Sequence, residues 1–267
     1  MMNEQVDIAI IGGTGVYDPG LLTDTKRVKV YTPYGAPSDL ITIGNYNGIK
    51  LAFIPRHGTD HHLPPHMVPY RANLWALKEL GVTRILAPCA VGSLRPEIKP
   101  GHIVIADQFL DFTKTREYSF YDGGQIAHIA VHESFCRELR DLAIATAKQF
   151  HIEVHDKANC ITIEGPRFST RAESEFFRDA AKGDIIGMTL VPECILAREL
   201  KMCYVSIASV TDYDTWADEP VDAMAVIKIM KENIKTIRKL ISEMLPKTPR
   251  ERGQECVCSF ALQDAVF

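Results

Sequence analysis

Short apolar runs alternate along the chain with longer segments in which apolar residues return every three or four positions. Several short runs are apolar at nearly every position, as expected for β-strands that are covered on both faces. These predicted strands are residues 6–11, 49–54, 83–91, 102–107, 159–163 and 203–210. The longer segments have the period of amphipathic helices and are residues 68–81, 133–150, 171–183, 191–201 and 222–245.

Strands that alternate with helices over the whole length predict an α/β fold. We expect a single domain over residues 1–246, with a central mixed, largely parallel sheet flanked by helices. Residues 247–267 follow as a C-terminal tail that contains a Cys-x-Cys pair. Pro192 lies near the start of its predicted helix, where a first helical turn tolerates proline.

Composition and charge narrow the classes of partner. The 267 residues are 46% hydrophobic and 24% charged, with a net charge of −4 at pH 7. This charge gives no reason to expect nucleic acid or an anionic membrane as a partner. The first residues do not have the pattern of a signal peptide, and no apolar run is long enough to span a bilayer. We therefore expect a cytoplasmic protein.

The first predicted strand stops at Gly12-Gly13-Thr14-Gly15. A dinucleotide-binding turn needs a third small residue three positions later and a helix directly after it. Asp18 stands at that position, and the segment VYDPG does not begin a helix, so this interpretation fails. A glycine turn with the hydroxyl of Thr14 can still bind a single phosphate, although glycine also makes tight turns that bind nothing.

Other strand ends carry groups that suit the same anion. Arg56 and His57 follow the second strand, and a guanidinium can bind an oxyanion through two N–H groups. Small residues beginning at Ala90 follow the third strand and would let the backbone approach a ligand. The histidines of residues 57–66 lie among prolines without a helical register and without a nearby Cys or Glu, so we expect no metal site.

Asp212 and Asp214 follow the last predicted strand. Alternating positions of an extended segment point to the same side, so both carboxylates could face one ligand. They could equally be local caps of a polar turn.

Eight segments occur in an order that resembles the 5′-methylthioadenosine phosphorylases of the trimeric purine nucleoside phosphorylase family. The resemblance covers about residues 6–245, and its segments are GGTGVYD, PRHG, VPYRANLWALKELGV, GSLRPEIKPGHIVIADQFLDFT, SFYDG, TIEGPRFSTRAES, IIGMTLVPE and SIASVTDYDTW. It implies that phosphate attacks the anomeric carbon of 5′-methylthioadenosine while the bond to adenine N9 breaks. The products would be adenine and 5-methylthioribose 1-phosphate. Inorganic phosphate would be a co-substrate, with no cofactor and no metal.

The resemblance also implies roles for individual residues. The phosphate-binding residues would be Thr14, Arg56, His57, Cys89, Ala90 and Thr189. Cys89 stands where a hydroxyl residue is common, and a thiol is a weaker hydrogen-bond donor. Met188 would lie against the ribose, and Phe168 would add apolar surface around the base or sugar.

At the base, the resemblance implies that Asp212 and Asp214 are the catalytic pair. A protonated Asp214 would donate to N7 of the purine, and a carboxylate would accept from the 6-amino group. Members that act on 6-oxopurines usually have Asn at the second position, so two aspartates favour adenine. His61 would contact the methylthio group, and His128 would reach it from a neighbouring subunit of a homotrimer or a dimer of trimers.

The range of substrates stays open. The enzyme could accept adenosine, inosine or guanosine as well, and a hydrolase or a non-catalytic nucleoside-binding protein are the remaining alternatives.

The state of the cysteines also stays open. The seven cysteines do not have zinc-site spacing. The tail resembles that of heat-adapted archaeal relatives, which implies Cys256–Cys258 or Cys136–Cys203 as candidate disulfides, with free buried thiols as the alternative.

Overall fold

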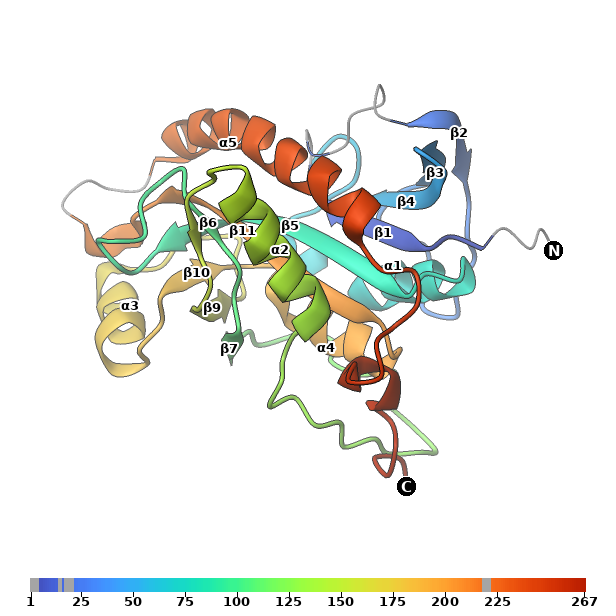
Figure 1. Cartoon of the computed structure of the whole chain (residues 1–267). Helices are drawn as coiled ribbons and strands as arrows, with labels where there is room; N and C mark the ends of the chain where they lie inside the picture. The colour runs from blue at the N-terminus through green and yellow to red at the C-terminus, as the bar shows by residue number, and fades with distance from the viewer. Residues whose placement is uncertain (1–4, 14–15, 17–21, 218–221) are drawn as a thin grey trace.

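Figure 1 shows the computed structural model, which describes residues 5–13, 16, 22–217 and 222–267. Within these residues one mixed sheet forms the centre, in the order β2-β3-β4-β1-β5-β10-β9-β7, and β11 joins it beside β5. The strands along this order are β2 (Thr23–Val28), β3 (Ile41–Tyr46), β4 (Ile49–Pro55), β1 (Ile8–Gly12), β5 (Arg84–Ser93), β10 (Ile185–Gly187), β9 (Asn159–Ile163) and β7 (Gln108–Phe112). The strands beyond β5 on its other edge are β11 (Cys203–Asp212), β6 (Ile103–Val104) and β8 (Val154–His155).

Most strand pairs are parallel, as the alternation of strands and helices predicts. β1 lies parallel to β4 and β5, and β11 runs parallel to β5. Antiparallel pairs occur at β2–β3, β3–β4, β5–β10 and β6–β11. The prediction of a mixed, largely parallel sheet is therefore confirmed.

Helices cover both faces of the sheet. α2 (Arg137–Gln149) and α5 (Ala223–Met244) pack together on the face nearer the viewer in Figure 1. α1 (Tyr70–Glu79) and α4 (Leu190–Glu199) pack together on the other face, and the short α3 (Arg171–Glu175) lies at the β7–β9 side. Consecutive strand residues such as Ile8 and Ala9 enter opposite cores, as side chains of a strand must.

Several elements differ from the prediction. The patterns missed five strands: the exposed polar β2, and β3, β7, β8 and β10. The predicted strand 102–107 is reduced to Ile103–Val104, and the predicted helix 171–183 is α3 followed by a π-helical turn at Phe176–Ala180. Pro192 does lie in the first turn of α4, although the backbone of Val191 before it is extended.

The C-terminal tail packs against the domain. Arg84 Nη2 donates to the carbonyl of Glu251 over 2.7 Å, and the amide of Gly253 donates to Glu138 Oε1 over 2.6 Å. The backbones of Ile126 and Phe267 exchange hydrogen bonds of 3.2 and 2.9 Å. The domain boundary at residue 246 stays a prediction. None of the helices in the described part of the chain has the length and apolar character that crossing a bilayer requires.

Candidate functional site

A cavity of about 500 Å³ opens where the parallel strands end. β1, β4, β5 and β11 all direct their carboxyl ends to it, which is where α/β sheets commonly bind ligands. The residues that line it include Gly13, Arg56, His57, His61, Cys89, Ala90, Phe168, Met188, Thr189, Asp212 and Asp214. The structure therefore brings together most of the site residues expected from the sequence. Thr14 lies outside the described residues.

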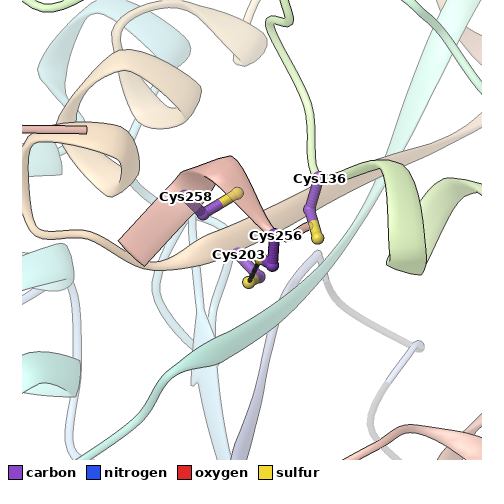
Figure 2. A group of neighbouring side chains, drawn as sticks. All are labelled: Cys136, Cys203, Cys256 and Cys258. Carbon is purple, nitrogen blue, oxygen red and sulfur yellow. Dashed lines mark hydrogen bonds between the residues drawn. The ribbon is translucent and has the colours of Figure 1, made fainter. Parts of the chain in front are cut away.

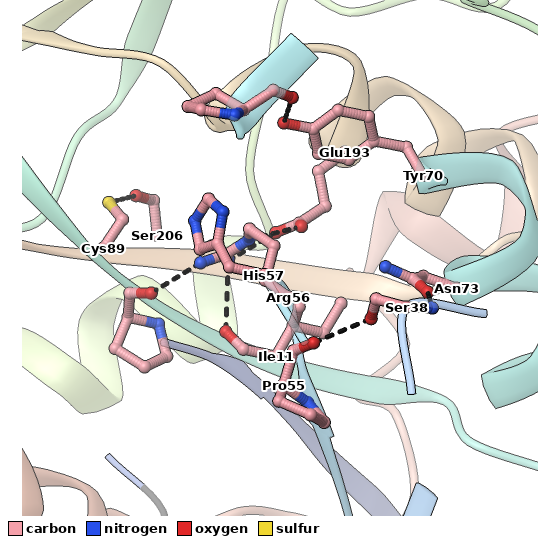
Figure 3. A network of polar contacts seen from close by, with 12 residues as sticks. Ile11, Ser38, Pro55, Arg56, His57, Tyr70, Asn73, Cys89, Glu193 and Ser206 are labelled. Carbon is pink, nitrogen blue, oxygen red and sulfur yellow. Dashed lines mark hydrogen bonds and ion pairs between the residues drawn. The ribbon is translucent and has the colours of Figure 1, made fainter. Parts of the chain in front are cut away.

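Arg56 is buried and held by partners within the chain. Its Nε and Nη2 donate to the two carboxylate oxygens of Glu193, each over 2.7 Å (Figure 3). Nη1 donates to the Pro88 carbonyl over 3.0 Å, and Nη2 to the Ile11 carbonyl over 3.1 Å. Four of the five N–H groups of a guanidinium are thus engaged, so Arg56 has one left to offer an anion. The two-pronged edge expected to face the anion faces Glu193 instead.

Glu193 fixes Arg56, and the sequence did not indicate it as a residue of this site. It is fully buried in α4, and besides Arg56 it accepts a hydrogen bond of 2.8 Å from the hydroxyl of Tyr204. Burial alone would lower the pKa of Arg56, but the Glu193 carboxylate outweighs burial and raises it. The guanidinium is therefore a permanent cation, and the carboxylate fixes its position. The signal in the sequence was an acidic residue four positions after Thr189, in a segment that is otherwise apolar.

His57 is a neutral imidazole. Its Nδ1 lies 2.9 Å from the carbonyl of Leu63, and because a carbonyl only accepts, Nδ1 carries the hydrogen. Burial and the nearby Arg56 cation lower the pKa of His57 to about 4. The ring lies 4.7 Å from the ring of His61. His57 thus adds no positive charge at neutral pH.

Three further residues border the same end of the cavity. The Cys89 thiol lies 3.6 Å from the Ser206 hydroxyl, and burial raises its pKa, so it stays neutral. Ala90, the next residue, is exposed. Thr189 precedes the first turn of α4, and its side chain makes no capping hydrogen bond. This end therefore offers the Thr189 hydroxyl beside the fixed Arg56.

Asp214 lies beside Gly92, farther along β5 than Pro88, which Arg56 contacts, and we call this the other end of the cavity; the side chain is buried without a partner for one oxygen. It is 3% exposed, and among the described residues its Oδ2 has no hydrogen-bond partner. The hydroxyls of Ser169 and Ser174 lie near it and also make no hydrogen bond within that part of the chain. Burial raises the pKa of Asp214 and outweighs the Ser174 and Ser169 hydroxyls, which lower it, and the Asp212 carboxylate also raises it. A carboxyl group of this kind can hold a proton near neutral pH and donate it to a ligand.

Asp212 is fixed beside Asp214. Its Oδ1 accepts from the amide of Asp214 over 2.8 Å, and its Oδ2 accepts from the Thr211 hydroxyl over 2.7 Å. The close approach depends on Gly92, because a Cβ there would lie 2.8 Å from Asp212 Oδ1. Trp216 ties the segment to β5 through a hydrogen bond of 2.8 Å from its indole N–H to the Ser93 carbonyl.

The geometric reason given for the two aspartates was wrong. β11 ends at Asp212, and Asp214 begins the 3-10 turn η4 (Asp214–Trp216) with a positive φ of 49°. The carboxylates border one cavity because the chain turns between them and not because an extended segment alternates.

Apolar side chains line the rest of the cavity. Phe168 and Met188 lie on one side, with Phe168 39% exposed. α5 adds an apolar wall made by Val226, Met230, Ile234 and Ile237. The sequence pattern predicted only that these residues lie on the apolar face of a helix. His128 does not line the cavity. Its amide donates to the Ala265 carbonyl over 2.8 Å, and its ring lies 6.2 Å from that of Phe267.

Comparison with known proteins gives consistent results. The sequence profile of the phosphorylase superfamily matches residues 7–246. The S-methyl-5′-thioadenosine phosphorylase of Pyrococcus furiosus is 58% identical over 256 residues, which cover 96% of this chain and 97% of that protein. The enzyme of the same name from Nitrosopumilus maritimus is 52% identical over 266 residues, which cover 100% of both chains.

Solved structures of similar proteins agree over nearly the whole chain. A methylthioadenosine phosphorylase from an antarctic soil metagenomic library has a TM-score of 0.94 at 42% identity, covering 99% of this chain and 93% of that one. The methylthioadenosine phosphorylase from Schistosoma mansoni in complex with adenine has a TM-score of 0.91 at 36% identity, covering 98% and 99%.

Proposed function

The chain belongs to the phosphorylase superfamily, and from this premise we propose that it cleaves 5′-methylthioadenosine with inorganic phosphate. The products are adenine and 5-methylthioribose 1-phosphate, which makes the protein a pentosyltransferase. Phosphate is a co-substrate, and the reaction needs no cofactor. The observation that carries the proposal for this site is the buried Asp214, whose Oδ2 has no partner in the described part of the chain, at the opposite end of the cavity from Arg56.

Asp214 is the proposed proton donor. As the bond between the anomeric carbon and N9 breaks, its electron pair moves into the purine ring, and the Asp214 carboxyl donates its proton to N7. The raised pKa of Asp214 supports this role because the acid must hold its proton until the bond breaks. Asp212, already oriented by Thr211 and the Asp214 amide, accepts from the 6-amino group of adenine.

Phosphate binds at the Arg56 end in this proposal. The remaining N–H of Arg56, the Thr189 hydroxyl and the backbone around Ala90 orient the anion against the positive charge that develops on the sugar. Cys89 and His57 border it as neutral groups. Thr14 is proposed as a further phosphate ligand from the resemblance alone.

The apolar part of the cavity is proposed to hold the sugar and its 5′-substituent. Met188 and Phe168 lie beside the sugar and base, and His61 with the α5 wall borders a methylthio group. The sulfur of such a group is only a weak acceptor, so apolar residues such as Met230 suit a methylthio group better than they suit a 5′-hydroxyl.

We also propose that the active unit is a homotrimer or a dimer of trimers. His128 lies outside the cavity of its own chain, beside the exposed Ile126 and Phe267. A neighbouring subunit is therefore where its side chain can reach a substrate. A cytoplasmic location stays a prediction from the sequence.

The test is a comparison of substrates with and without phosphate. We expect adenine release from methylthioadenosine only when phosphate is present, at a kcat/KM above those for adenosine and inosine. Inosine as the best substrate would instead indicate a broad purine nucleoside phosphorylase. Release of adenine without phosphate would indicate a hydrolase.

A further inference from the structure

Four cysteines from three distant parts of the chain meet where the C-terminal tail packs against the domain (Figure 2). Cys136 precedes the first turn of α2, Cys203 is the first residue of β11, and Cys256 and Cys258 lie at the 3-10 turn η6 (Val257–Phe260). All four side chains are buried, and none of them lines the catalytic cavity. The remaining cysteines, Cys89, Cys160 and Cys194, lie elsewhere.

The sulfur atoms have the spacing of a tetrahedral metal site. Each of the four lies within 4.8 Å of every other, and Cys203 and Cys256 are 3.4 Å apart. Four sulfurs around one zinc ion at about 2.3 Å stand about 3.8 Å from one another. A pair of disulfides would need only two close sulfur pairs, whereas a metal site needs all six to be close, as they are here.

The surroundings of the cluster balance the charge that such a site carries. Four thiolates and one Zn²⁺ have a net charge of −2, which burial would penalise without a nearby cation. The fully buried Arg84 supplies one, because its Nη1 donates to Cys203 Sγ over 3.2 Å. Cys136 is the N-cap residue of α2, so it stands at the positive end of the helix dipole. A helix N-terminus and a charged donor thus already face the sulfurs, as partners of metal ligands do.

We propose that Cys136, Cys203, Cys256 and Cys258 bind one zinc ion as a closed structural site. Thiolate ligands without carboxylates favour a soft cation, and four of them leave no open position for a substrate. The ion fastens the tail to the start of α2 and β11. Arg84 acts in the same place, since it also bonds Glu138 and the Glu251 carbonyl. The spacing of these cysteines hides the site from sequence inspection because the fold alone brings them together.

The first test uses the wild-type protein, purified anaerobically with reductant and then freed of small molecules. We expect about one zinc per chain by elemental mass spectrometry. After replacement of zinc by Co²⁺, the thiolate-to-cobalt charge-transfer band and strong visible bands of a tetrahedral site should appear. Intact mass under denaturing conditions, with a chelator and no reductant, should correspond to seven free thiols.

The second test compares two single substitutions. Cys258→Ser removes a ligand. Loss of a residue that only hydrogen-bonds to a ligand lowers metal affinity roughly 10- to 100-fold, so Cys258→Ser should lower zinc affinity by more than this. Cys160→Ser makes the same change at a buried cysteine outside the cluster and should retain zinc. If Cys258→Ser does not fold, Cys256→Ser and the wild-type cobalt spectrum give the same information.

Three results would overturn the proposal. The first is a wild-type mass lower by two hydrogens per disulfide with no zinc bound, which would support the pairings suggested by the resemblance. The second is a reduced protein that binds neither zinc nor cobalt. The third is equal zinc content in Cys258→Ser and Cys160→Ser. None of these depends on the proposed enzymatic activity.

Discussion

Arg56 and Asp214 are both buried at one cavity, yet within the described residues Arg56 has partners for most of its N–H groups while one oxygen of Asp214 has none. Glu193 binds one edge of its guanidinium through two N–H groups, and backbone carbonyls accept from two more N–H groups. Asp214 Oδ2 and the serine hydroxyls near it have none in the described part of the chain. In the proposed mechanism, the phosphate end is therefore complete before substrate arrives, and the purine completes the base end.

This difference has a physical reason. An anion that binds early needs a rigid, already charged partner, because reorganising a buried cation during the reaction would raise the barrier. A general acid must instead gain and lose a proton, so it cannot be locked in a bidentate ion pair. An unpartnered buried carboxyl destabilises the fold, and such groups persist at functional sites.

The largest expected effect on activity follows from removing the carboxyl group of Asp214. Asp214→Asn keeps the shape of the side chain but removes the proton that is given to N7, so kcat on methylthioadenosine should fall about 10²- to 10⁴-fold. Steady-state kinetics at saturating phosphate measures it. Asp141→Asn, the same change on the exposed side of α2, is the control and should leave kcat unchanged. Equal turnover in wild type and Asp214→Asn would remove Asp214 from this role.

Next is the removal of the partner of Arg56. Glu193→Gln leaves a buried guanidinium without its counter-charge, which should lower the free energy of unfolding by about 3 kcal/mol. The KM for phosphate should rise more than kcat falls, because the cation is no longer fixed. Urea denaturation and phosphate titration measure the two effects. An unchanged unfolding midpoint together with an unchanged KM would contradict the role given to Glu193.

A smaller effect is expected at Gly92. The Cβ of Gly92→Ala would lie 2.8 Å from Asp212 Oδ1, so the carboxylate must move. We expect roughly a tenfold loss in kcat/KM for methylthioadenosine, since small displacements of orienting groups reduce rates. The KM for phosphate should stay the same because the change lies at the other end. A larger change in the KM for phosphate than in kcat/KM for methylthioadenosine would contradict the separation of the two ends.

The smallest effect concerns stability and pH. A carboxyl whose folded pKa is raised stabilises the fold fully only below its unfolded pKa, near 3.9, and that contribution is lost as pH rises through the folded value. Asp214→Asn lacks this titration. The melting temperature of the variant minus that of wild type should therefore increase from acid to neutral pH. A difference in melting temperature that does not vary with pH would mean that the fold does not raise the pKa of Asp214.

The polar groups in turns after buried strands allowed Arg56, His57 and the two aspartates to be predicted as site residues from the chain itself. The resemblance, and not the pattern, supplied the roles of the other cavity residues, which are His61, Cys89, Phe168, Met188 and Thr189. Glu193 was missed because an acidic residue on a predicted helix is usually exposed. The α5 wall was missed because apolar residues at helical spacing do not distinguish a core from a cavity. The exposed β2 and the four-cysteine cluster were invisible because both depend on contacts between distant segments.

A crystal structure of this chain with adenine and phosphate bound tests the central claim most directly. We predict Asp214 Oδ2 within hydrogen-bonding distance of N7, about 2.6–3.2 Å, with the anion next to an Arg56 that still holds Glu193. An Asp214 carboxyl turned away from the heterocycle, or an anion bound far from Arg56, would contradict the account.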